Sequence, residues 1–329
     1  MKRAMLKSMR RFGVFAAFRK MNKHKALIVT YHRFSRVEDG RSTSADALAE
    51  QLAYLKAHYS VVPLSEIADC IANAKPLPSR AAAVTIDDGF RDAFEIAFPL
   101  LRANRVPATL FVITDFVDGK IWLWTDKLRY LMSRVPSGSA RIKFRGYDNS
   151  FKLDGTFSRL AAADSVNSFL KTLRDNDKDA AIEEIAANLN VSLPDLPTDE
   201  FGPVSWDQAI EMDRAGIEVG SHTITHPILP NLSDEHLERE LTGSRVRLET
   251  VLGRKSNLFC YPNGSYDHRA RLAVAKAGYE CAVTTEPGLV DSQSDPLALC
   301  RIPAEMDLDH FAQSTSGFEQ VKNRLIHHQ

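Results

Sequence analysis

Thr85-Ile86-Asp87-Asp88-Gly89-Phe90 closes an apolar run, residues 81–86, with two adjacent carboxylates. The run predicts a strand, on which neighbouring side chains point to opposite faces. Past the last strand residue, a turn at Gly89 can bring both carboxylates to one cavity. One aspartate can then bind a metal ion while the other accepts a proton from a water molecule. As an alternative, Asp87 or Asp88 could be the N-cap of the helix that follows.

A second polar stretch, Gly220-Ser221-His222-Thr223-Ile224-Thr225-His226-Pro227, follows the apolar residues 216–219. His222 and His226 are four positions apart, a spacing that places both side chains on one face of a helical turn. Two histidines and one carboxylate make a three-ligand metal site with an open position for water, as in hydrolytic zinc enzymes. A single histidine at a strand end is more often structural. The pair, together with Asp87 and Asp88, favours a metal site.

Strand and helix patterns alternate along most of the chain. Short apolar runs predict strands at residues 26–31, 81–86, 108–114, 217–221, 257–261, 280–285 and 298–302. Alternation with short connections implies right-handed crossovers and a parallel sheet. The sequence therefore predicts an α/β fold, a distorted (β/α)7-8 barrel with its functional residues at the carboxyl ends of the strands. The polar candidates at these ends are His32, Asp87, Asp88, His222, His226 and Tyr261.

The alternation stops between residues 118 and 203, where helical patterns and a hairpin pattern at 142–153 predict a mostly helical insertion. Insertions between barrel strands usually lie at the rim of the active site, so we expect this one to shape the substrate groove. The expected parts are a basic N-terminal segment, a barrel in two pieces, the insertion and a C-terminal tail: residues 1–25, 26–117 with 204–305, 118–203 and 306–329.

The charges of the chain are balanced overall but unevenly distributed. Lysine plus arginine and aspartate plus glutamate number 42 each, so no net charge favours nucleic acid as a partner. Residues 1–25, however, hold nine basic residues and no acidic one. Such a segment can lie on an anionic inner membrane leaflet, although a solvated basic tail would have the same composition.

The chain has no convincing targeting or membrane-spanning segment. No apolar run approaches the ~20 residues that a membrane span requires. The apolar residues 12–18 are the candidate for the core of a secretory signal peptide, but Arg19 and Lys20 end this run too early. We therefore expect a cytoplasmic protein or a peripheral protein at the inner membrane face.

Three motifs occur in the order found in a known enzyme family: Thr-Ile-Asp-Asp-Gly at 85–89, Ser-His-Thr-x-Thr-His-Pro at 221–227 and Tyr-Pro-Asn-Gly at 261–264. Over roughly residues 26–305 the chain resembles the polysaccharide deacetylases with the NodB homology domain, carbohydrate esterase family 4. The resemblance implies a hydrolase that removes acetyl groups from N-acetylhexosamine units of a polysaccharide or glycan precursor, such as an exopolysaccharide or cell-envelope glycan. It also implies one divalent metal ion, with zinc as the first choice and cobalt, nickel or iron as alternatives.

The roles of the site residues combine the chemistry above with this resemblance. The metal ion would polarise an amide or ester carbonyl and acidify a bound water. A backbone N–H near the third motif could bind the oxyanion. The expected set comprises the metal ligands Asp88, His222 and His226, the general base Asp87, and the oxyanion and substrate residues Tyr261, Pro262 and Gly264.

The chain departs from the commoner family pattern at two positions. Most members carry an arginine two residues before the proline of the third motif, where it orients the base, but Cys260 stands here. Arg301 could take over this role or could form only an ion pair at the rim. The family's Leu-x-His acid is replaced by Asp309-His310-Phe311. Tyr31-His32-Arg33 instead resembles the poly-β-1,6-N-acetylglucosamine deacetylase-like branch, whose acid histidine comes from the first strand by circular permutation. We expect His32 to be the acid, with a buried structural histidine as the alternative.

Two other functions are compatible with this set of residues. An O-acetyl esterase or another amide hydrolase could use the same metal site. A carbohydrate-binding barrel could have lost turnover because Cys260 replaced the arginine. The full set of Asp87, Asp88, His222 and His226 argues against a binding protein, which needs no base beside a metal.

Overall fold

The computed structural model describes residues 2–320, which divide into two compact units. One unit comprises the chain up to Val117 and from Val204 onward, and the other comprises Asp118–Pro203. Each unit has hydrophobic clusters of its own.

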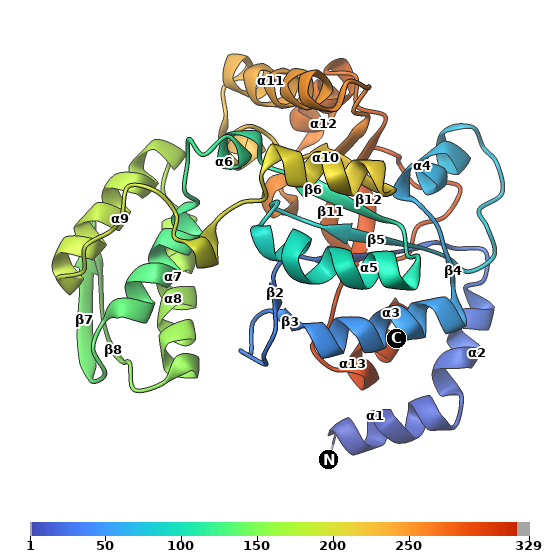
Figure 1. Cartoon of the computed structure of the whole chain (residues 1–329), viewed down its shortest axis with the longest axis horizontal. Coiled ribbons are helices and arrows are strands. Elements are labelled where there is room, and N and C mark those ends of the chain that lie inside the picture. Colours follow the sequence, from blue (N-terminus) through green and yellow to red (C-terminus); the bar gives the residue numbers. More distant parts are fainter. Residues whose placement is uncertain (1, 321–329) are drawn as a thin grey trace, which may run out of the picture. The chain divides into compact units, whose positions relative to one another are not determined.

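Seven parallel strands of the first unit close into a barrel, with helices on the outside (Figure 1). The order around the ring is β1, β12, β11, β10, β9, β6 and β5, and β1 pairs with β5 to close it. A short strand, β4, pairs with the start of β5. The predicted (β/α)7-8 barrel is confirmed. The strands are β1 Leu27–Tyr31, β4 Ser60–Val61, β5 Ala81–Ile86, β6 Ala108–Val112, β9 Ile217–Ser221, β10 Leu258–Cys260, β11 Cys281–Pro287 and β12 Leu299–Pro303.

The barrel core follows from the apolar runs. All residues of β1, β5 and β6 are buried, as expected for strands covered on both faces. Alternate side chains of one strand therefore belong to two clusters: Val29 packs with the outer helices, whereas Ile28 belongs to another cluster with Ala83 and Val283. This closed packing fixes where the carboxyl ends of the strands meet.

Helices begin at residues suited to cap them. Ser44, Ser205, Ser233 and Asp267 each accept a hydrogen bond from a backbone N–H of the first helical turn. The helices around the barrel are α3 Ala45–His58, α4 Leu64–Ala72, α5 Phe98–Asn104, α6 Thr114–Val117, α10 Trp206–Arg214, α11 Asp234–Leu252 and α12 His268–Lys276. A π-helical turn, η1 Ala93–Ala97, precedes α5, and two 3-10 turns are η3 Leu229–Asn231 and η4 Pro262–Gly264. Two short strands, β2 Phe34–Ser35 and β3 Thr43–Ser44, pair with each other.

The two ends of the described chain form helices that pack together. They are α1 Lys2–Arg11, α2 Val14–Met21 and α13 Leu308–Thr315. Leu6 and Phe311 are buried, and the Nε of Arg10 lies 2.6 Å from Oδ1 of Asp309. The N-terminal segment is therefore not a solvated tail, and α13 lies within the expected C-terminal tail, whose residues 321–329 are outside the described part.

No helix among residues 2–320 combines the length and apolarity needed to cross a bilayer.

The second unit consists of three main helices and an antiparallel hairpin. They are α7 Trp124–Arg134, β7 Ser139–Phe144, β8 Tyr147–Lys152, α8 Thr156–Leu170 and α9 Asp175–Leu189, with a 3-10 turn η2 at Asp199–Phe201. Leu131, Ile142 and Ile182 belong to its own core. Trp122 is buried within the unit, 5.4 Å from the ring of Tyr130. The unit is mostly helical, as expected.

Candidate active site

The backbone turns sharply at the carboxyl end of β5. The N–H of Asp87 still donates to the carbonyl oxygen of Tyr31, at 2.9 Å, as part of the sheet. Asp88 and Gly89 then have φ values of 74° and 81°. A Cβ at position 89 would lie 3.0 Å from Cγ1 of Val112, so both φ and space favour glycine. Helical backbone begins only at Arg91, so neither Asp87 nor Asp88 stands at the N-cap position, and the alternative that one of them caps the helix is wrong.

Three side chains at the ends of β5 and β9 meet in one place. Oδ1 of Asp88 lies 3.4 Å from Nε2 of His222 and 3.7 Å from Nε2 of His226. Ligand atoms around a tetrahedral zinc ion with bonds of about 2.0–2.1 Å lie about 3.3 Å apart. These three atoms therefore fit a single ion. The side chain of Asp88 is 15% exposed, which leaves the group open to solvent on one side.

The surroundings of His222 and His226 affect which ring nitrogens can bind a metal ion and how readily each ring takes up a proton. Nδ1 of His222 lies 2.7 Å from the carbonyl oxygen of Cys260, so this nitrogen donates and Nε2 faces Asp88. Burial lowers the pKa of His226 to about 3, which keeps its lone pair free. Burial also opposes a charge on His222, but Cys260 and Asp88 raise the pKa of His222 well above its usual range. A metal ion can bind Nε2 of His222 only when this nitrogen carries no proton, so ion binding would be coupled to proton release.

The loop that carries both histidines is not a helical turn, so that part of the prediction is wrong. Thr223 and His226 have φ values of 72° and 63°, in the left-handed region. The hydroxyl oxygen of Thr223 accepts the N–H of His226 at 2.9 Å, and the hydroxyl donates to the carbonyl of His222. The tight loop brings the two imidazole centroids to 4.7 Å, so the expected pair forms by another backbone path.

Asp87 contacts a buried arginine instead of the histidine pair. Nη1 and Nη2 of Arg301 donate to Oδ1 and Oδ2 of Asp87 at 2.7 and 2.6 Å, and both side chains are buried. Burial alone would raise the pKa of Asp87, but Arg301 lowers it to about 2. Nε of Arg301 donates to the carbonyl of Thr284, at 2.7 Å. Arg301 thus makes a buried two-point contact with Asp87 and is not an ion pair at the rim.

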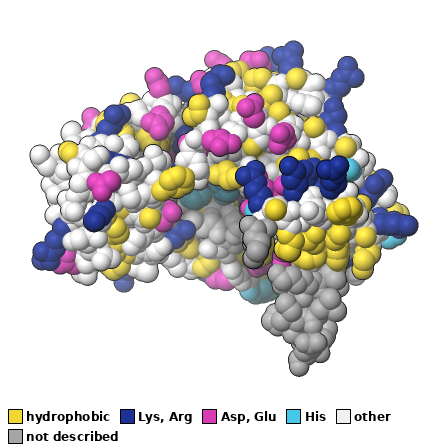
Figure 2. Space-filling model, turned by 90° about the horizontal axis from the view of Figure 1, so that it is seen from below, with side chains coloured by type: hydrophobic (Ala, Val, Ile, Leu, Met, Phe, Trp, Pro, Cys, Tyr) yellow, Lys and Arg dark blue, Asp and Glu magenta, His cyan; other side chains and the backbone are white. Residues whose placement is uncertain are grey.

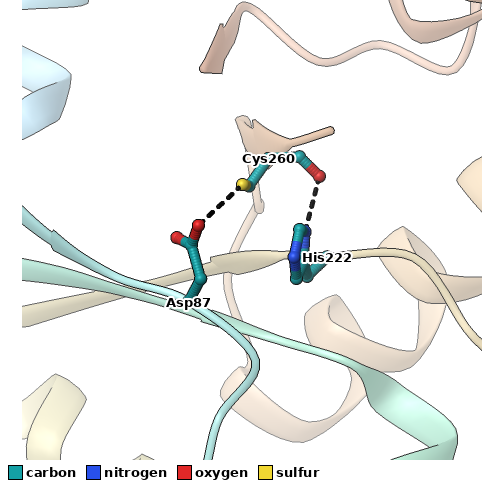
Figure 3. A group of neighbouring side chains, drawn as sticks. All are labelled: Asp87, His222 and Cys260. Atoms are coloured by element: carbon teal, nitrogen blue, oxygen red, sulfur yellow. Dashed lines mark hydrogen bonds between the residues drawn. The ribbon is translucent and has the colours of Figure 1, made fainter. Parts of the chain in front are cut away.

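Cys260 lies beside the same carboxylate (Figure 3). Its Sγ is 3.5 Å from Oδ2 of Asp87 and 3.3 Å from Nη2 of Arg301. Asp87, His222 and Cys260 therefore form a second close group of potential metal ligands. This group suits an ion poorly, because Arg301 binds both oxygens of Asp87 and burial raises the pKa of the Cys260 thiol. The Asp88 group is the candidate metal centre.

His32 lies beside Asp87. Its Nε2 is 3.7 Å from Oδ2 of Asp87, and half of its side chain is exposed. The alternative of a buried structural histidine does not fit this exposure. His310, by contrast, places its Nδ1 2.6 Å from the carboxylate of Asp307 at the start of α13. Of these two histidines, His32 is the one beside the candidate base.

A model of the polysaccharide deacetylase family matches residues 74–149 and 154–282, more than half of the chain. The chain belongs to the polysaccharide deacetylase family. It is 35% identical over 292 residues to the poly-beta-1,6-N-acetyl-D-glucosamine N-deacetylase of Escherichia coli K12, a match that covers 87% of this chain and 37% of that protein. It is 32% identical over 96 residues to the putative polysaccharide deacetylase YxkH of Bacillus subtilis, covering 29% of this chain and 34% of that protein. The chain thus spans about a third of the length of these relatives.

Two solved deacetylase structures share the fold. The deacetylase PplD from Streptococcus pyogenes, solved with acetate, aligns with a TM-score of 0.60 at 17% identity, covering 89% of this chain and 98% of that chain. IcaB from Ammonifex degensii aligns with a TM-score of 0.56 at 19% identity, covering 88% and 97%. At these identities the likeness shows the fold alone.

The third motif, residues 261–264, forms the turn that follows β10. The N–H of Tyr261 donates to the carbonyl of Val283 at 3.1 Å, as part of the barrel sheet, so this N–H is not free to bind an oxyanion. The Tyr261 hydroxyl donates to Leu297, and Pro262 is buried. Gly264 has a φ of 66°, and a Cβ there would lie 2.5 Å from the nitrogen of Thr285. The motif therefore forms a tight turn that packs against β11.

One buried residue beside the candidate metal centre was not expected from the sequence. Glu240 of α11 is buried and accepts hydrogen bonds from the loop that carries the histidines. A signal was present in the helix pattern, because Leu237, Leu241 and Leu248 mark the buried face and Glu240 lies on it. An acidic residue on such a face needs a hydrogen-bonding partner.

Proposed function

We propose that this chain is a metal-dependent N-deacetylase that removes acetyl groups from N-acetylhexosamine units of a polysaccharide or glycan precursor. The proposal rests on one observation: two adjacent carboxylates have different partners. Asp88 is grouped with two histidines, whereas Asp87 is bound by Arg301. A binding protein has no use for a charged, oriented base beside a metal site.

The substrate class rests on the family and on a named relative. The Escherichia coli relative is described as acting on poly-β-1,6-N-acetyl-D-glucosamine, and it is 35% identical to this chain. We propose an acetylated hexosamine glycan of this kind as the substrate, and an exopolysaccharide or cell-envelope glycan as its source. An O-acetyl ester on the same glycan would fit the same chemistry and remains an outcome of the test.

Asp88, His222 and His226 would hold the metal ion. A bound zinc ion would polarise the acetyl carbonyl and acidify water. Cobalt, nickel or iron could take its place. Zinc is the first choice because two imidazoles and one carboxylate suit it.

Asp87 would accept the proton of the attacking water. Its pKa of about 2 keeps it ionised at neutral pH, and Arg301 fixes the plane of the carboxylate. A carboxylate has about four lone-pair directions. Arg301 donates to each oxygen, and the Thr30 hydroxyl and the Cys260 thiol each lie 3.5 Å from Oδ2, so these contacts leave the second direction on Oδ1 for the proton. The low pKa also makes Asp87 a weak base, so the reaction depends on an acidified water. His32, which is half exposed and lies 3.7 Å from Asp87, would give a proton to the leaving amine.

The test is metal content by elemental analysis, paired with acetate release from two substrates. These are acetylated chitooligosaccharides and β-1,6-linked N-acetylglucosamine oligomers, each with and without chelator. We expect about one transition metal ion per chain and chelator-sensitive release, faster from the β-1,6 oligomers. Metal without acetate release would point to the esterase or carbohydrate-binding alternatives. No metal after reconstitution with zinc would overturn the proposal.

We also propose that residues 1–25 contact an anionic membrane surface, such as the inner membrane face. Leu6 of α1 and Phe15 of α2 are buried, whereas Met5, Met21 and Phe12 are exposed. Phe12 lies in the turn between the two helices and is 84% exposed. Figure 2 shows Lys and Arg side chains beside hydrophobic ones on the face where α1 lies. Each basic residue near an anionic surface adds about 1 kcal/mol, and the exposed apolar side chains favour lipid over a purely polar polyanion.

Sedimentation with lipid vesicles tests this contact. We expect binding to vesicles with phosphatidylglycerol, little binding to phosphatidylcholine alone, and weaker binding for Phe12→Ala. Phe157→Ala is the matched control, because Phe157 is 78% exposed on α8 in the other unit. Equal binding of wild type to both vesicle types, or equal loss in both variants, would contradict the proposal.

A further inference from the structure

We propose that Glu240 is a positioning residue that holds the loop of residues 222–226 in its metal-binding conformation. The inference rests on the proposed metal-dependent function, and it assigns a role to a residue outside the three motifs.

Glu240 is bound to the loop through both of its carboxylate oxygens. Oε2 accepts the backbone N–H of Ile224 at 2.8 Å and that of Thr225 at 3.0 Å. Oε1 accepts the hydroxyl of Thr225 at 2.7 Å. The carboxylate is buried, where hydrogen bonds to a charged acceptor are stronger than in water. One side chain therefore fixes two successive peptide groups between the two histidine ligands.

The loop needs such support because its backbone is strained. Thr223 and His226, on either side of the Glu240 contacts, have φ values of 72° and 63°. Residues with a Cβ adopt this region only when their surroundings hold them there. If the loop relaxed toward ordinary φ values, the imidazoles of His222 and His226 would no longer point at Asp88 together.

Backbone hydrogen bonds from the start of α6 also hold the loop. The carbonyls of Thr223 and Ile224 accept the N–H groups of Thr114 and Asp115 at 3.1 and 3.0 Å, at the start of α6. No substitution removes these contacts cleanly. Glu240 supplies its hydrogen bonds through a side chain, which can be changed, so its contribution can be measured.

Helix α11 is built to approach this loop closely. A Cβ at Gly243 would lie 2.6 Å from Cδ1 of Ile224, so glycine leaves the space that Ile224 fills. Glu240 and Gly243 are three residues apart and lie on the same side of the helix. On one face of the helix, the Glu240 carboxylate thus binds the backbone of the loop, and the space at Gly243 accommodates the Ile224 side chain.

The experiment measures zinc affinity directly, in competition with a chromophoric chelator, on the metal-free full chain. For Glu240→Gln we expect about 10–100-fold weaker zinc binding, the range seen when residues that support metal ligands are changed. The cobalt form should show a changed visible absorption spectrum, which reports ligand geometry. Glu238→Gln is the matched control: it is the same chemical change on the same helix, at an exposed position. It should bind zinc like the wild type.

A milder variant keeps the test decisive if Glu240→Gln does not fold. Thr225→Val removes only the hydroxyl that donates to Oε1 of Glu240. We expect a smaller weakening of zinc binding in the same direction. Wild-type zinc affinity and an unchanged cobalt spectrum in a folded Glu240→Gln chain would overturn the role of Glu240 and leave the proposed function standing. Failure of the wild type itself to bind zinc would overturn both, so the two failures are distinguishable.

Discussion

Asp87 and Asp88 are neighbours in the chain, yet their surroundings differ in almost every respect. Asp87 is buried, lies in the sheet and binds Arg301 through both oxygens. Asp88 has a left-handed backbone, is partly exposed and faces two histidines. The positive charge that balances Asp87 is part of the protein. The charge that would balance Asp88 is a proton or a metal ion from outside.

This difference arises from one backbone turn. Because Asp88 and Gly89 leave the strand with positive φ, the two carboxylates point to different partners instead of repelling each other across one cavity. Two close carboxylates without such partners would share a proton. The structure thus separates the proposed base from the proposed metal ligand within two adjacent residues.

The largest effect is expected for Asp87→Asn. The amide cannot accept the proton of the attacking water, so acetate release should fall about 10²–10⁴-fold, the usual worth of a general base. Steady-state acetate assays on zinc-loaded protein measure this loss. Activity near that of the wild type would show that Asp87 is not the base.

Arg301→Met should be the most destabilising change on the Asp87 side. It leaves a buried carboxylate without its cation, which typically costs about 3–5 kcal/mol of unfolding free energy. Urea titrations followed by circular dichroism measure this loss. Arg301→Lys keeps the charge but not the two-point contact, so it should lose less stability than Arg301→Met. Equal losses in the two variants would mean that the charge of Arg301 does not matter.

His32→Ala should separate two classes of substrate. Cleavage of an amide needs a proton on the leaving amine, whereas an activated aryl ester has a leaving group that needs none. We expect about 10²-fold or greater loss on N-acetyl substrates and a much smaller loss on aryl acetates. Since His32 is half exposed, its removal should leave the melting temperature nearly unchanged. An equal loss on both substrates would indicate a structural role.

The smallest effect concerns stability at low pH. Contacts with Arg301 lower the pKa of Asp87 from 3.8 to about 2. A lowered pKa contributes stability above the unfolded value, and this contribution, about 2 kcal/mol, is lost as the pH falls from 4 through 2. The difference in unfolding free energy between wild type and Asp87→Asn should therefore narrow over this range. A constant difference would mean that Asp87 is not held ionised by Arg301.

The barrel and most of the candidate site were accessible from the sequence. Apolar runs predicted the strands, and parallel strands in a barrel carry their polar residues to one end. This is why His32, Asp87 and Arg301, far apart in the chain, could be assigned to one place. Arg301 reaches Asp87 because β12 and β5 both lie beside β1 in the closed ring.

Other features depend on information that the local sequence lacks. The spacing of His222 and His226 suggested a helix, but side-chain and backbone partners elsewhere hold the loop in left-handed conformations that residue types alone do not favour. Whether the N–H of Tyr261 was free depended on the pairing of β10 with β11. The docking of α1 on α13 joins Arg10 to Asp309 across nearly the whole chain. All three features depend on contacts between residues that are far apart in the sequence.

We propose that Asp88 binds the metal ion and that Asp87 does not. The most direct test is the zinc content of Asp87→Asn and Asp88→Asn, loaded and dialysed together with the wild type. Asp87→Asn should retain about one zinc ion per chain, like the wild type, and Asp88→Asn should retain little. Equal loss of zinc in the two variants, or retention by Asp88→Asn alone, would contradict the division of roles between these two neighbours.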